Sequence, residues 1–471
     1  MTRRTSSVLI ALVALLGIAA ANPMVLLEQL MAEQRAHVHK PGYAATAEIP
    51  PETVTDVPCK DGTALDFACD NVDLLAFWPS ADFGGILSMD PTGQVFSGNS
   101  DVWGWTDADT GTEIAMIGHA NGTAFFRVNG GTDAEYLGSV VNTAAQHAIW
   151  HDIKTVNDHA LIVSESAPNH GMQVVDLNAL VDAPAVPAGA PLLPDAIFTG
   201  SGSQHNVVTN DDTDFAYIVG GGLKLRTPIG GIGIASECDG GLFMIDMADP
   251  LNPVDAGCYE GDEYIHDAQC VTYAGPDTRF TGREICATFS EDYMSFVDVT
   301  DKANPQTIGR LGYDDTQYTH QGWFTEDFRY VLMNDELDEM RASNVTHTRT
   351  LVIDATDLTA PVLHHTAMRD GTDGNPATPS IDHNNYTHEG LAYQSNYTAG
   401  LRVIDMGGLD ATTPVWDEVA FFDTYPADDA ATFNGTWSNY PYFDSGVIVV
   451  SGIGEGIFFL KLDDAVTSTI E

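Results

Sequence analysis

The segment Leu242-Phe243-Met244-Ile245-Asp246-Met247 is a short run of apolar residues with high β-propensity, followed by Asp246 and Met247. Further runs of this kind, ending in Asp or a substitute, recur along the chain at intervals of roughly fifty residues. They are Ala124–Asn129, Met172–Leu177, Met294–Val299, Leu351–Ala355, Leu401–Met406 and Ile457–Leu462. A regular repeat of this length is typical of β-propellers, in which each repeat forms one blade.

Each repeat contains more than this one strand. Before the run lies another apolar strand reached through a polar turn, as in Ala216–Val219. After several runs a further strand follows, as in Asp249–Gly257, where Asp and Pro favour a tight turn. About four short antiparallel strands per repeat is the content of one blade. The sequence therefore predicts an all-β fold, a seven-bladed β-propeller of four-stranded antiparallel blades.

Closing such a ring requires one blade to combine strands from both ends of the chain. The last run, Ile457–Leu462, is followed by almost no chain, whereas Val72–Trp78 is a strand without a blade of its own. We expect this N-terminal strand to complete the seventh blade, which leaves little exposed sheet edge. The propeller is then expected to span residues 59–462, with residues 463–471 as a polar tail.

The first residues have the order of charge and hydrophobicity that is typical of a signal peptide. Two arginines precede the apolar run Val8–Leu16, and an A-x-A sequence ending at Ala21 follows. We predict a signal peptide over residues 1–21, an extracellular, periplasmic or cell-surface location, and no integral membrane segment after cleavage. Residues 22–58 are predicted to form an arm that is helical around Met24–Arg35.

The chain is strongly acidic. Its 471 residues include 19 Lys and Arg against 67 Asp and Glu, a formal net charge of −48. Such a surface repels nucleic acid, so we expect no nucleic-acid partner. Adaptation to a salty medium explains the charge, because salt screens the repulsion between carboxylates. Binding of divalent cations by some of these carboxylates is a second interpretation, and the two can coexist.

Six cysteines in a chain predicted to be exported favour disulfides. Sequence alone allows 15 pairings, but the spacing suggests three local bridges, namely Cys59–Cys69, Cys238–Cys258 and Cys270–Cys286. No C-x-x-C sequence is present, which argues against thiol redox chemistry and against a zinc site built from cysteines.

Several longer blocks accompany the repeats. They are Cys59–Cys69 with Asn71–Leu75, Ser100–Thr106, Gly171–Val174, His266–Cys270 with Gly282–Cys286, Tyr318–Trp323 with Asn334–Glu339, and Phe421–Pro426. With these blocks, the repeats resemble the LVIVD-repeat proteins, and the chain from about residue 59 to 462 resembles the choice-of-anchor B family. The resemblance implies an exported propeller and brings no established reaction. The C-terminal surface anchors to which that family's name refers are not recognisable here.

A histidine followed by a small polar residue enters the predicted first strand of five successive repeats. These pairs are His151-Asp152, His205-Asn206, His266-Asp267, His320-Gln321 and His383-Asn384, and Trp105-Thr106 and Trp437-Ser438 occupy the corresponding places in the first and seventh repeats. First strands line the axial channel of a propeller, so the five imidazoles are expected to face a common space.

Two interpretations of these histidines stay open. Imidazole is a good ligand for copper, zinc, nickel or iron, so the set could hold one or more ions, with Asp152 and Asp267 as neighbouring groups. The blander interpretation is that each ring hydrogen-bonds the neighbouring blade and fixes the geometry between blades.

Two acidic segments have the density of oxygen atoms that calcium requires. One follows a predicted strand and contains Asp335, Glu336, Asp338 and Glu339. The other contains Asp107 and Asp109. A solvated acidic loop is the alternative for the first segment, and a hairpin turn is the alternative for the second.

The sequence contains no G-x-S-x-G elbow, no H-E-x-x-H helix and no phosphate-binding P-loop. It therefore favours a non-catalytic module that binds an unknown protein, glycan or surface ligand. The alternative is a metal-dependent enzyme in which the channel histidines hold copper, zinc or iron. A hydrolase or lyase that uses carboxylates at the channel mouth is a third hypothesis.

Overall fold

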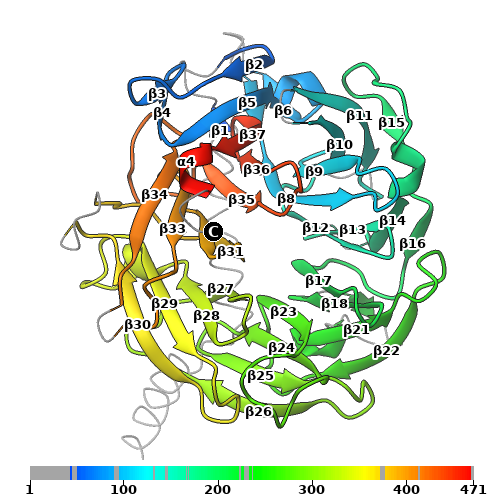
Figure 1. The fold of residues 1–471 in the computed structure, drawn as a ribbon. Coiled ribbons are helices and arrows are strands. Elements are labelled where there is room, and N and C mark those ends of the chain that lie inside the picture. The colour runs from blue at the N-terminus through cyan, green and yellow to red at the C-terminus, as the bar shows by residue number, and fades with distance from the viewer. Residues whose placement is uncertain are drawn as a thin grey trace, which may run out of the picture. The chain divides into compact units, whose positions relative to one another are not determined.

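The computed structural model describes residues 43–44, 50–89, 95–130, 133–143, 147–165, 167, 169–221, 224–226, 233–235, 237–371, 377–411 and 414–467. In this part of the chain the strands form a ring around a central axis (Figure 1), and we use the word channel for the space along that axis, which side chains partly fill. The ring has seven blades of antiparallel strands, which confirms the predicted β-propeller. The signal peptide and the helix expected around Met24–Arg35 lie outside the described residues.

Blades one to three follow one another along the chain. Blade one contains β8 (Asn99–Thr106), β9 (Glu113–His119), β10 (Gly122–Asn129), β11 (Asp133–Val141) and a short parallel strand, β15 (Pro191–Leu192). Blade two contains β12 (His151–Val156), β13 (His159–Ser164), β14 (Met172–Asp176) and β16 (Ala196–Phe198). Blade three contains β17 (Asn206–Asn210), β18 (Phe215–Val219), β21 (Leu242–Asp246) and β22 (Val254–Tyr259).

Blades four and five have the simplest form, four consecutive strands each. Blade four contains β23 (Asp267–Thr272), β24 (Glu284–Phe289), β25 (Met294–Asp298) and β26 (Gln306–Leu311). Blade five contains β27 (Thr319–Phe324), β28 (Tyr330–Asp335), β29 (Arg349–Asp354) and β30 (Val362–Met368). The recurring apolar runs form the third strand of every blade, β10, β14, β21, β25, β29, β33 and β37.

Blades six and seven take their outer strands from the N-terminal part of the propeller. Blade six contains β31 (Asn384–His388), β32 (Leu391–Ser395), β33 (Leu401–Asp405) and β34 (Asp417–Phe422), followed by β4 (Phe67–Asp70) and β3 (Thr63–Ala64). Blade seven contains β35 (Thr436–Tyr440), β36 (Val447–Gly452), β37 (Gly456–Leu462), β5 (Val72–Pro79) and β2 (Val54–Val57). The predicted closure by the N-terminal strand is therefore confirmed, because β5 pairs with β37. The strand β2 comes from residues that the sequence assigned to the arm.

Several short strands and helices lie outside the seven blades. Three short strands, β1 (Tyr43–Ala44), β6 (Ile86–Met89) and β7 (Val95–Ser97), form a separate sheet, and β19 (Lys224–Arg226) pairs with β20 (Gly233–Ala235). The helices are α3 (Asp338–Arg341), α4 (Asp464–Thr467) and the 3-10 turns η1 (Ser80–Phe83), η2 (Leu177–Leu180) and η3 (Glu237–Gly240). Among the described residues, no helix has the length and hydrophobicity needed to cross a bilayer.

The core lies between neighbouring blades. Successive side chains of a strand point to opposite faces of its sheet, so each blade buries both of its faces. In β13, Ala160 and Ile162 pack against blade one, whereas Leu161 and Val163 pack against blade three. Similar buried clusters fill the other spaces between blades. This two-sided burial explains why the strands read as nearly continuous apolar runs.

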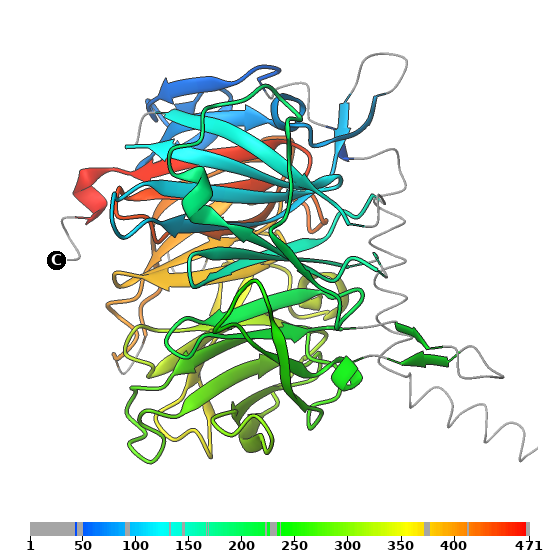
Figure 2. The ribbon, with the colours of Figure 1, turned by 90° about the vertical axis from the view of Figure 1, so that its right-hand side faces the viewer.

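The first strand of each blade lies innermost and contacts the first strands of the adjacent blades around the channel. All of these strands run in the same direction along the channel. Their N-terminal ends therefore meet at one end, which we call the histidine end, and their C-terminal ends meet at the opposite end. The β19–β20 hairpin and α4 lie on opposite faces of the ring (Figure 2).

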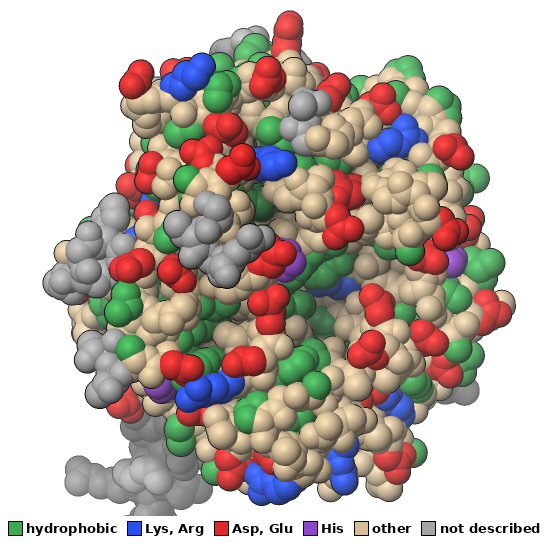
Figure 3. Space-filling view, viewed as in Figure 1, with side chains coloured by type: hydrophobic (Ala, Val, Ile, Leu, Met, Phe, Trp, Pro, Cys, Tyr) green, Lys and Arg blue, Asp and Glu red, His purple; other side chains and the backbone are tan. Residues whose placement is uncertain are grey.

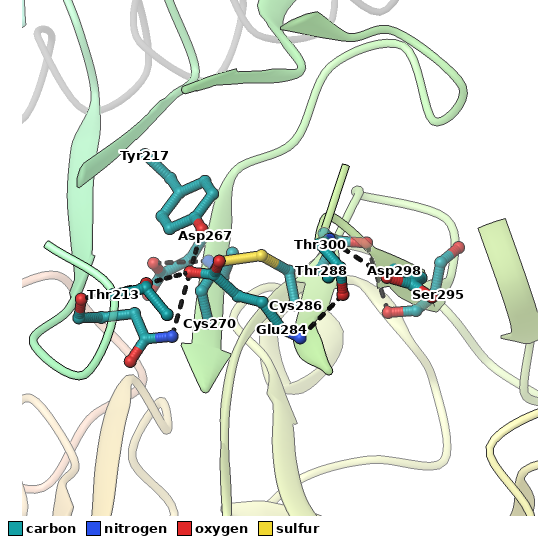
Figure 4. Close-up of a disulfide and its surroundings, with 12 residues drawn as sticks. Thr213, Tyr217, Asp267, Cys270, Glu284, Cys286, Thr288, Ser295, Asp298 and Thr300 are labelled. Atoms are coloured by element: carbon teal, nitrogen blue, oxygen red, sulfur yellow. Dashed lines mark hydrogen bonds between the residues drawn. A yellow bond between two sulfur atoms is a disulfide. The ribbon is translucent and has the colours of Figure 1, made fainter. Parts of the chain in front are cut away.

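Three disulfides join the cysteine pairs that the spacing suggested, Cys59–Cys69, Cys238–Cys258 and Cys270–Cys286. Cys270 and Cys286 are direct partners on β23 and β24 of blade four (Figure 4). Cys59 follows β2 of blade seven and Cys69 lies in β4 of blade six. The first disulfide therefore crosses between the outer edges of the last two blades.

Substituting Phe77 tests the closure of the ring. Its ring lies 4.6 Å from that of Phe458 in β37 and 6.1 Å from that of Phe67 in β4, all three fully buried. Phe77→Ala leaves a cavity at this seam, so we expect the free energy of unfolding to fall by about 3–5 kcal/mol. Urea denaturation followed by circular dichroism measures the change. Leu193→Ala, at a side chain that is 82% exposed, is the control, and an equally small effect of both variants would contradict the closure.

Candidate metal centre at the histidine end of the channel

The fold places each predicted histidine at the start of a first strand. His205 and His383 immediately precede β17 and β31, and His320 is the second residue of β27. The backbone N–H of His266 donates to the carbonyl of Phe289, the last residue of the second strand of the same blade. Strand pairing thus holds these side chains at the same end of the channel.

Four of the five histidines form one row. The ring centroids of His205 and His266 are 4.2 Å apart, those of His266 and His320 are 4.2 Å apart, and those of His320 and His383 are 4.4 Å apart. We call these four residues, from blades three to six, the imidazole arc. Trp437, the expected counterpart in blade seven, continues the arc at 4.7 Å from His383.

The Nδ1 atoms of the arc bind the neighbouring blade. Nδ1 of His266 donates to the carbonyl of His320 at 2.9 Å, and Nδ1 of His383 donates to the carbonyl of Trp437 at 2.6 Å. The structural role considered from the sequence is therefore real for these two rings. A neutral imidazole that donates through Nδ1 keeps a lone pair on Nε2, so the same contacts leave Nε2 available as a ligand.

His320 departs from this pattern. His266 donates to the carbonyl of the histidine in the next blade, His320. The equivalent acceptor for His320 is the carbonyl of His383, but the side-chain amide of Asn334 donates to it instead. Within the described part of the chain, Nδ1 of His320 makes no hydrogen bond of normal geometry, although the ring is only 3% exposed. Its Nε2 faces the carboxylate of Glu336 at 3.7 Å.

Glu336 lies between two rings of the arc. Its Oε1 is 3.6 Å from Nε2 of His383 and accepts a hydrogen bond from the hydroxyl of Tyr397 at 2.6 Å. One ligand atom each from His320, Glu336 and His383 can be chosen so that all three lie within 4.8 Å of one another. Among the described residues, this is the grouping of three buried side chains whose donor atoms can meet at a single metal ion.

Electrostatics keep these imidazoles neutral. Burial holds the pKa of His320 well below its usual value, and nearby His266 lowers it further. Burial also lowers the pKa of His383 to about 3 and raises the pKa of Glu336 to about 7. Neutral imidazoles bind metal without first releasing a proton, whereas the protonated fraction of Glu336 releases its proton when a cation binds.

The far end of the arc differs. Burial opposes the charged form of His205, but the carboxylate of Glu165 outweighs it and raises the pKa of His205. Nδ1 of His205 lies 2.5 Å from Oε2 of Glu165, so this pair forms a buried ion pair. His205 is therefore paired with Glu165, whereas His320 and His383 both face the carboxylate of Glu336.

Two tyrosines line the same end of the channel. The ring of Tyr318 lies 5.2 Å from that of His266, and burial together with Glu165 and Glu291 raises the pKa of Tyr264 well above its usual value. Neither phenol makes a hydrogen bond of normal geometry within the part of the chain that the structure describes. Both are buried, so their hydroxyls are donors available to a bound ligand.

His151 does not join the arc. Its Nε2 lies 2.6 Å from the side-chain oxygen of Asn142, and its ring contacts that of His170 at 6.0 Å. Burial and the nearby His170 hold the pKa of His151 well below its usual value. The structure thus brings four of the five predicted imidazoles together and places the fifth in a separate contact.

The predicted acidic neighbours lie deeper in the channel. Asp152 accepts a hydrogen bond from Lys154 at 2.9 Å and another from the backbone N–H of Val207 at 2.7 Å. Burial and the carboxylate of Asp152 raise the pKa of Asp267 to about 7. Lys154 also binds Asp101 at 3.1 Å, so a buried ion cluster fills the middle of the channel.

Three of the four carboxylates expected to bind calcium in the first segment, Asp335, Asp338 and Glu339, stay close to one another beside Arg349, and Glu336 points away from them. Asp335 accepts the backbone N–H groups of Gln317 and Tyr318, at 2.7 and 2.8 Å, and Asp338 pairs with Arg349 at 2.5 Å. Glu339 accepts the backbone N–H of Asp382 at 3.3 Å. Glu336 alone turns toward the imidazole arc.

The second predicted calcium segment forms the turn between β8 and β9. The carboxylate of Asp107 accepts the backbone N–H of Thr110 at 3.0 Å, the pattern of a side-chain-stabilised turn. Asp109 is exposed.

Sequence reasoning did not assign Glu165 to the imidazoles, and it gave Glu336 to calcium. The position of these two acids relative to the second strand of their blades could have placed them near the imidazoles. The backbone N–H of Glu165 donates to Trp150, and that of Glu336 donates to Tyr318, next to the start of the first strand. A residue just past the second strand therefore always returns to the histidine end, where an acid can meet an imidazole.

No protein-family model matches the chain, and a search among curated proteins finds no match. Solved structures similar in chain path include one of U3-55K, with TM-score 0.47, 8% identity and coverage of 78% of this chain and 95% of that one. The WD40 repeats of RRP9 give TM-score 0.47, 8% identity and coverage of 83% and 100%. Hydrazine synthase of Kuenenia stuttgartiensis gives TM-score 0.46, 10% identity and coverage of 73% and 91%. What the channel can do chemically follows from its own residues.

Proposed function

We propose that this propeller is an exported binding module whose ligand is a transition-metal ion held at the histidine end of the channel. The ligands are Nε2 of His320, Nε2 of His383 and the carboxylate of Glu336. The observation that carries the proposal is the convergence of these three buried groups within 4.8 Å.

A buried carboxylate beside neutral imidazoles favours a cation. Glu336 is 1% exposed and burial raises its pKa to about 7, so near neutral pH it either keeps a proton or, when charged, needs a compensating charge. Neutral His320 and His383 do not supply that charge. A divalent ion bound between the three side chains supplies it.

The donor set selects the class of metal. Two imidazoles and one carboxylate suit zinc, copper or iron, whereas calcium prefers a shell made only of oxygen atoms. Tyr397, which donates to Glu336, and the carbonyl of Trp437, which accepts from His383, orient the ligands as outer-shell groups do in metal sites.

Export is part of the proposal. The three disulfides support an oxidising compartment, because such bonds persist outside the cytosol. The resemblance of the repeats to LVIVD-repeat and choice-of-anchor B proteins is consistent with an extracellular or cell-surface role. The proposal keeps the non-catalytic binding module that the sequence favoured, and it names a metal ion as the ligand in place of a protein, glycan or surface.

One observation favours the second candidate, a metal-dependent enzyme. The hydroxyls of Tyr264 and Tyr318 lie buried at the same end of the channel with no hydrogen bond of normal geometry to the described residues. Three protein ligands leave coordination positions open, as catalytic metal sites do. Phenols near such positions could hold a small substrate in place.

Metal titration tests the site. We expect the purified protein, stripped with a chelator, to bind one Zn²⁺ or Cu²⁺ ion per chain in calorimetry. Because two of the three ligands are lost, the double variant His320→Ala and His383→Ala should lower the affinity by about 100-fold or more. His151→Ala is the matched control, since His151 is a buried channel histidine outside the arc. Equal binding by wild type and double variant would refute the site.

The outer shell gives a separate test. Tyr397→Phe removes the hydrogen bond to Glu336 and keeps the ring, so the affinity for Zn²⁺ should fall by about 10- to 100-fold. Tyr386→Phe removes a buried hydroxyl three residues beyond His383, on a ring that contacts Trp103 and Trp323, and should leave the affinity unchanged. Thermal melts without metal check that both variants fold. An unchanged affinity in Tyr397→Phe would show that Glu336 is not a ligand.

A further inference from the structure

A pocket of about 340 Å³ opens at the end of the channel opposite the imidazole arc. It is lined by side chains from the C-terminal ends of first strands and the turns that follow them, including Trp103, Lys154, Asn210, Asp211, Gln269 and Trp323. Figure 3 shows this face of the ring, hollowed near its centre and surrounded by acidic side chains. The pocket shares no residue with the proposed metal site.

One wall of the pocket is aromatic. The ring centroids of Trp103 and Trp323 are 6.4 Å apart, and Tyr386 lies between them, 5.6 Å from Trp103 and 4.9 Å from Trp323. Both indoles are only half-buried although they lie inside the channel. They therefore offer flat apolar surface to a ligand.

The opposite wall is polar and carries both donors and acceptors. Asn210 uses Nδ2 to donate to Glu284 at 2.9 Å, and Gln269 uses Oε1 to accept the backbone N–H of Phe324 at 2.7 Å. Within the described part of the chain, the side-chain oxygen Oδ1 of Asn210 and the side-chain nitrogen Nε2 of Gln269 make no further hydrogen bond, so both remain for a ligand. Thr209 and Thr272 add hydroxyl groups to the same lining.

This wall is rigid before any ligand arrives. Glu284 of blade four accepts hydrogen bonds from Asn210, Thr213 and Tyr217 of blade three, and the disulfide Cys270–Cys286 lies beside it (Figure 4). The two blades that form the polar wall are therefore held together. A preorganised wall lowers the entropic cost of binding.

Charge narrows the class of ligand. The carboxylates of Asp211 and Asp212 at the rim disfavour phosphates and other anions. The ammonium of Lys154, 4.4 Å from the Trp103 ring centroid, occupies the place that a cation would take over that indole. A neutral ligand with one apolar face and several hydroxyl groups satisfies both walls.

We propose that this pocket binds a carbohydrate of one or two sugar rings. The C–H face of a pyranose packs on Trp323, since the ammonium of Lys154 already lies over the Trp103 ring, and its hydroxyls exchange hydrogen bonds with Asn210, Gln269 and Asp211. The volume is at the small end of ligand pockets, which run from about 300 to 1,000 Å³, and suits a ligand of that size.

The experiment titrates the full chain with glucose, mannose, galactose, N-acetylglucosamine, maltose, cellobiose and chitobiose, with tryptophan fluorescence and calorimetry as readouts. At least one sugar should bind with a stoichiometry of one per chain. Trp323→Ala should weaken that binding about tenfold, because the stacking surface is lost. Trp78→Phe, which changes an indole outside the pocket, should leave the affinity unchanged.

Asp211→Ala is a second variant that we expect to fold normally, because Asp211 is exposed and its side chain does not belong to the core. It should weaken sugar binding several-fold and keep the melting temperature of the wild type. Putrescine serves as the cationic probe. The proposal is overturned when no sugar of the panel binds, when Trp323→Ala and Asp211→Ala both leave sugar binding unchanged, or when putrescine saturates the pocket in place of sugars.

Discussion

The pairing of β5 with β37 is the contact on which the architecture depends. Every blade buries its two faces against its neighbours, so an open ring would expose the facing surfaces of the blades beside the gap. The register of β5 on β37 runs from Pro79 opposite Gly456 to Val72 opposite Leu462. Backbone hydrogen bonds between distant parts of the chain thus hold all the spaces between blades closed.

Closure also creates the chemistry of the channel. First strands converge only because the ring is complete, and their N-terminal ends bring His205, His266, His320 and His383 into van der Waals range. Within the arc the two nitrogens of one imidazole ring have different roles. Nδ1 of His266 and His383 joins adjacent blades, while Nε2 of His383 faces Glu336. Structural and ligand-binding roles are therefore compatible in the same residue.

The sequence predicted the blades, the closing strand and the disulfide pairs, because repeats, spare strands and local spacing are visible along one dimension. It did not predict that His151 turns to Asn142 and His170, since those partners come from irregular segments without a repeat. Nor could it separate Glu336 from Asp335, which differ in orientation and not in composition. The pocket beside Trp323 depends on how side chains from five blades meet, which no linear pattern records.

The use of β4 and β5 as outer strands of the last two blades has a consequence for synthesis in the cell. Blades three to five are built from segments that follow one another along the chain and can assemble as they leave the ribosome, whereas blade one also takes β15 from the chain between β14 and β16 of blade two. Blades six and seven are completed by β4 and β5, which are made hundreds of residues earlier and can until then pair only with their neighbours β3 and β2. Until the last strands emerge, β4 and β5 each keep one edge without its later partner, and such an edge can pair with another chain.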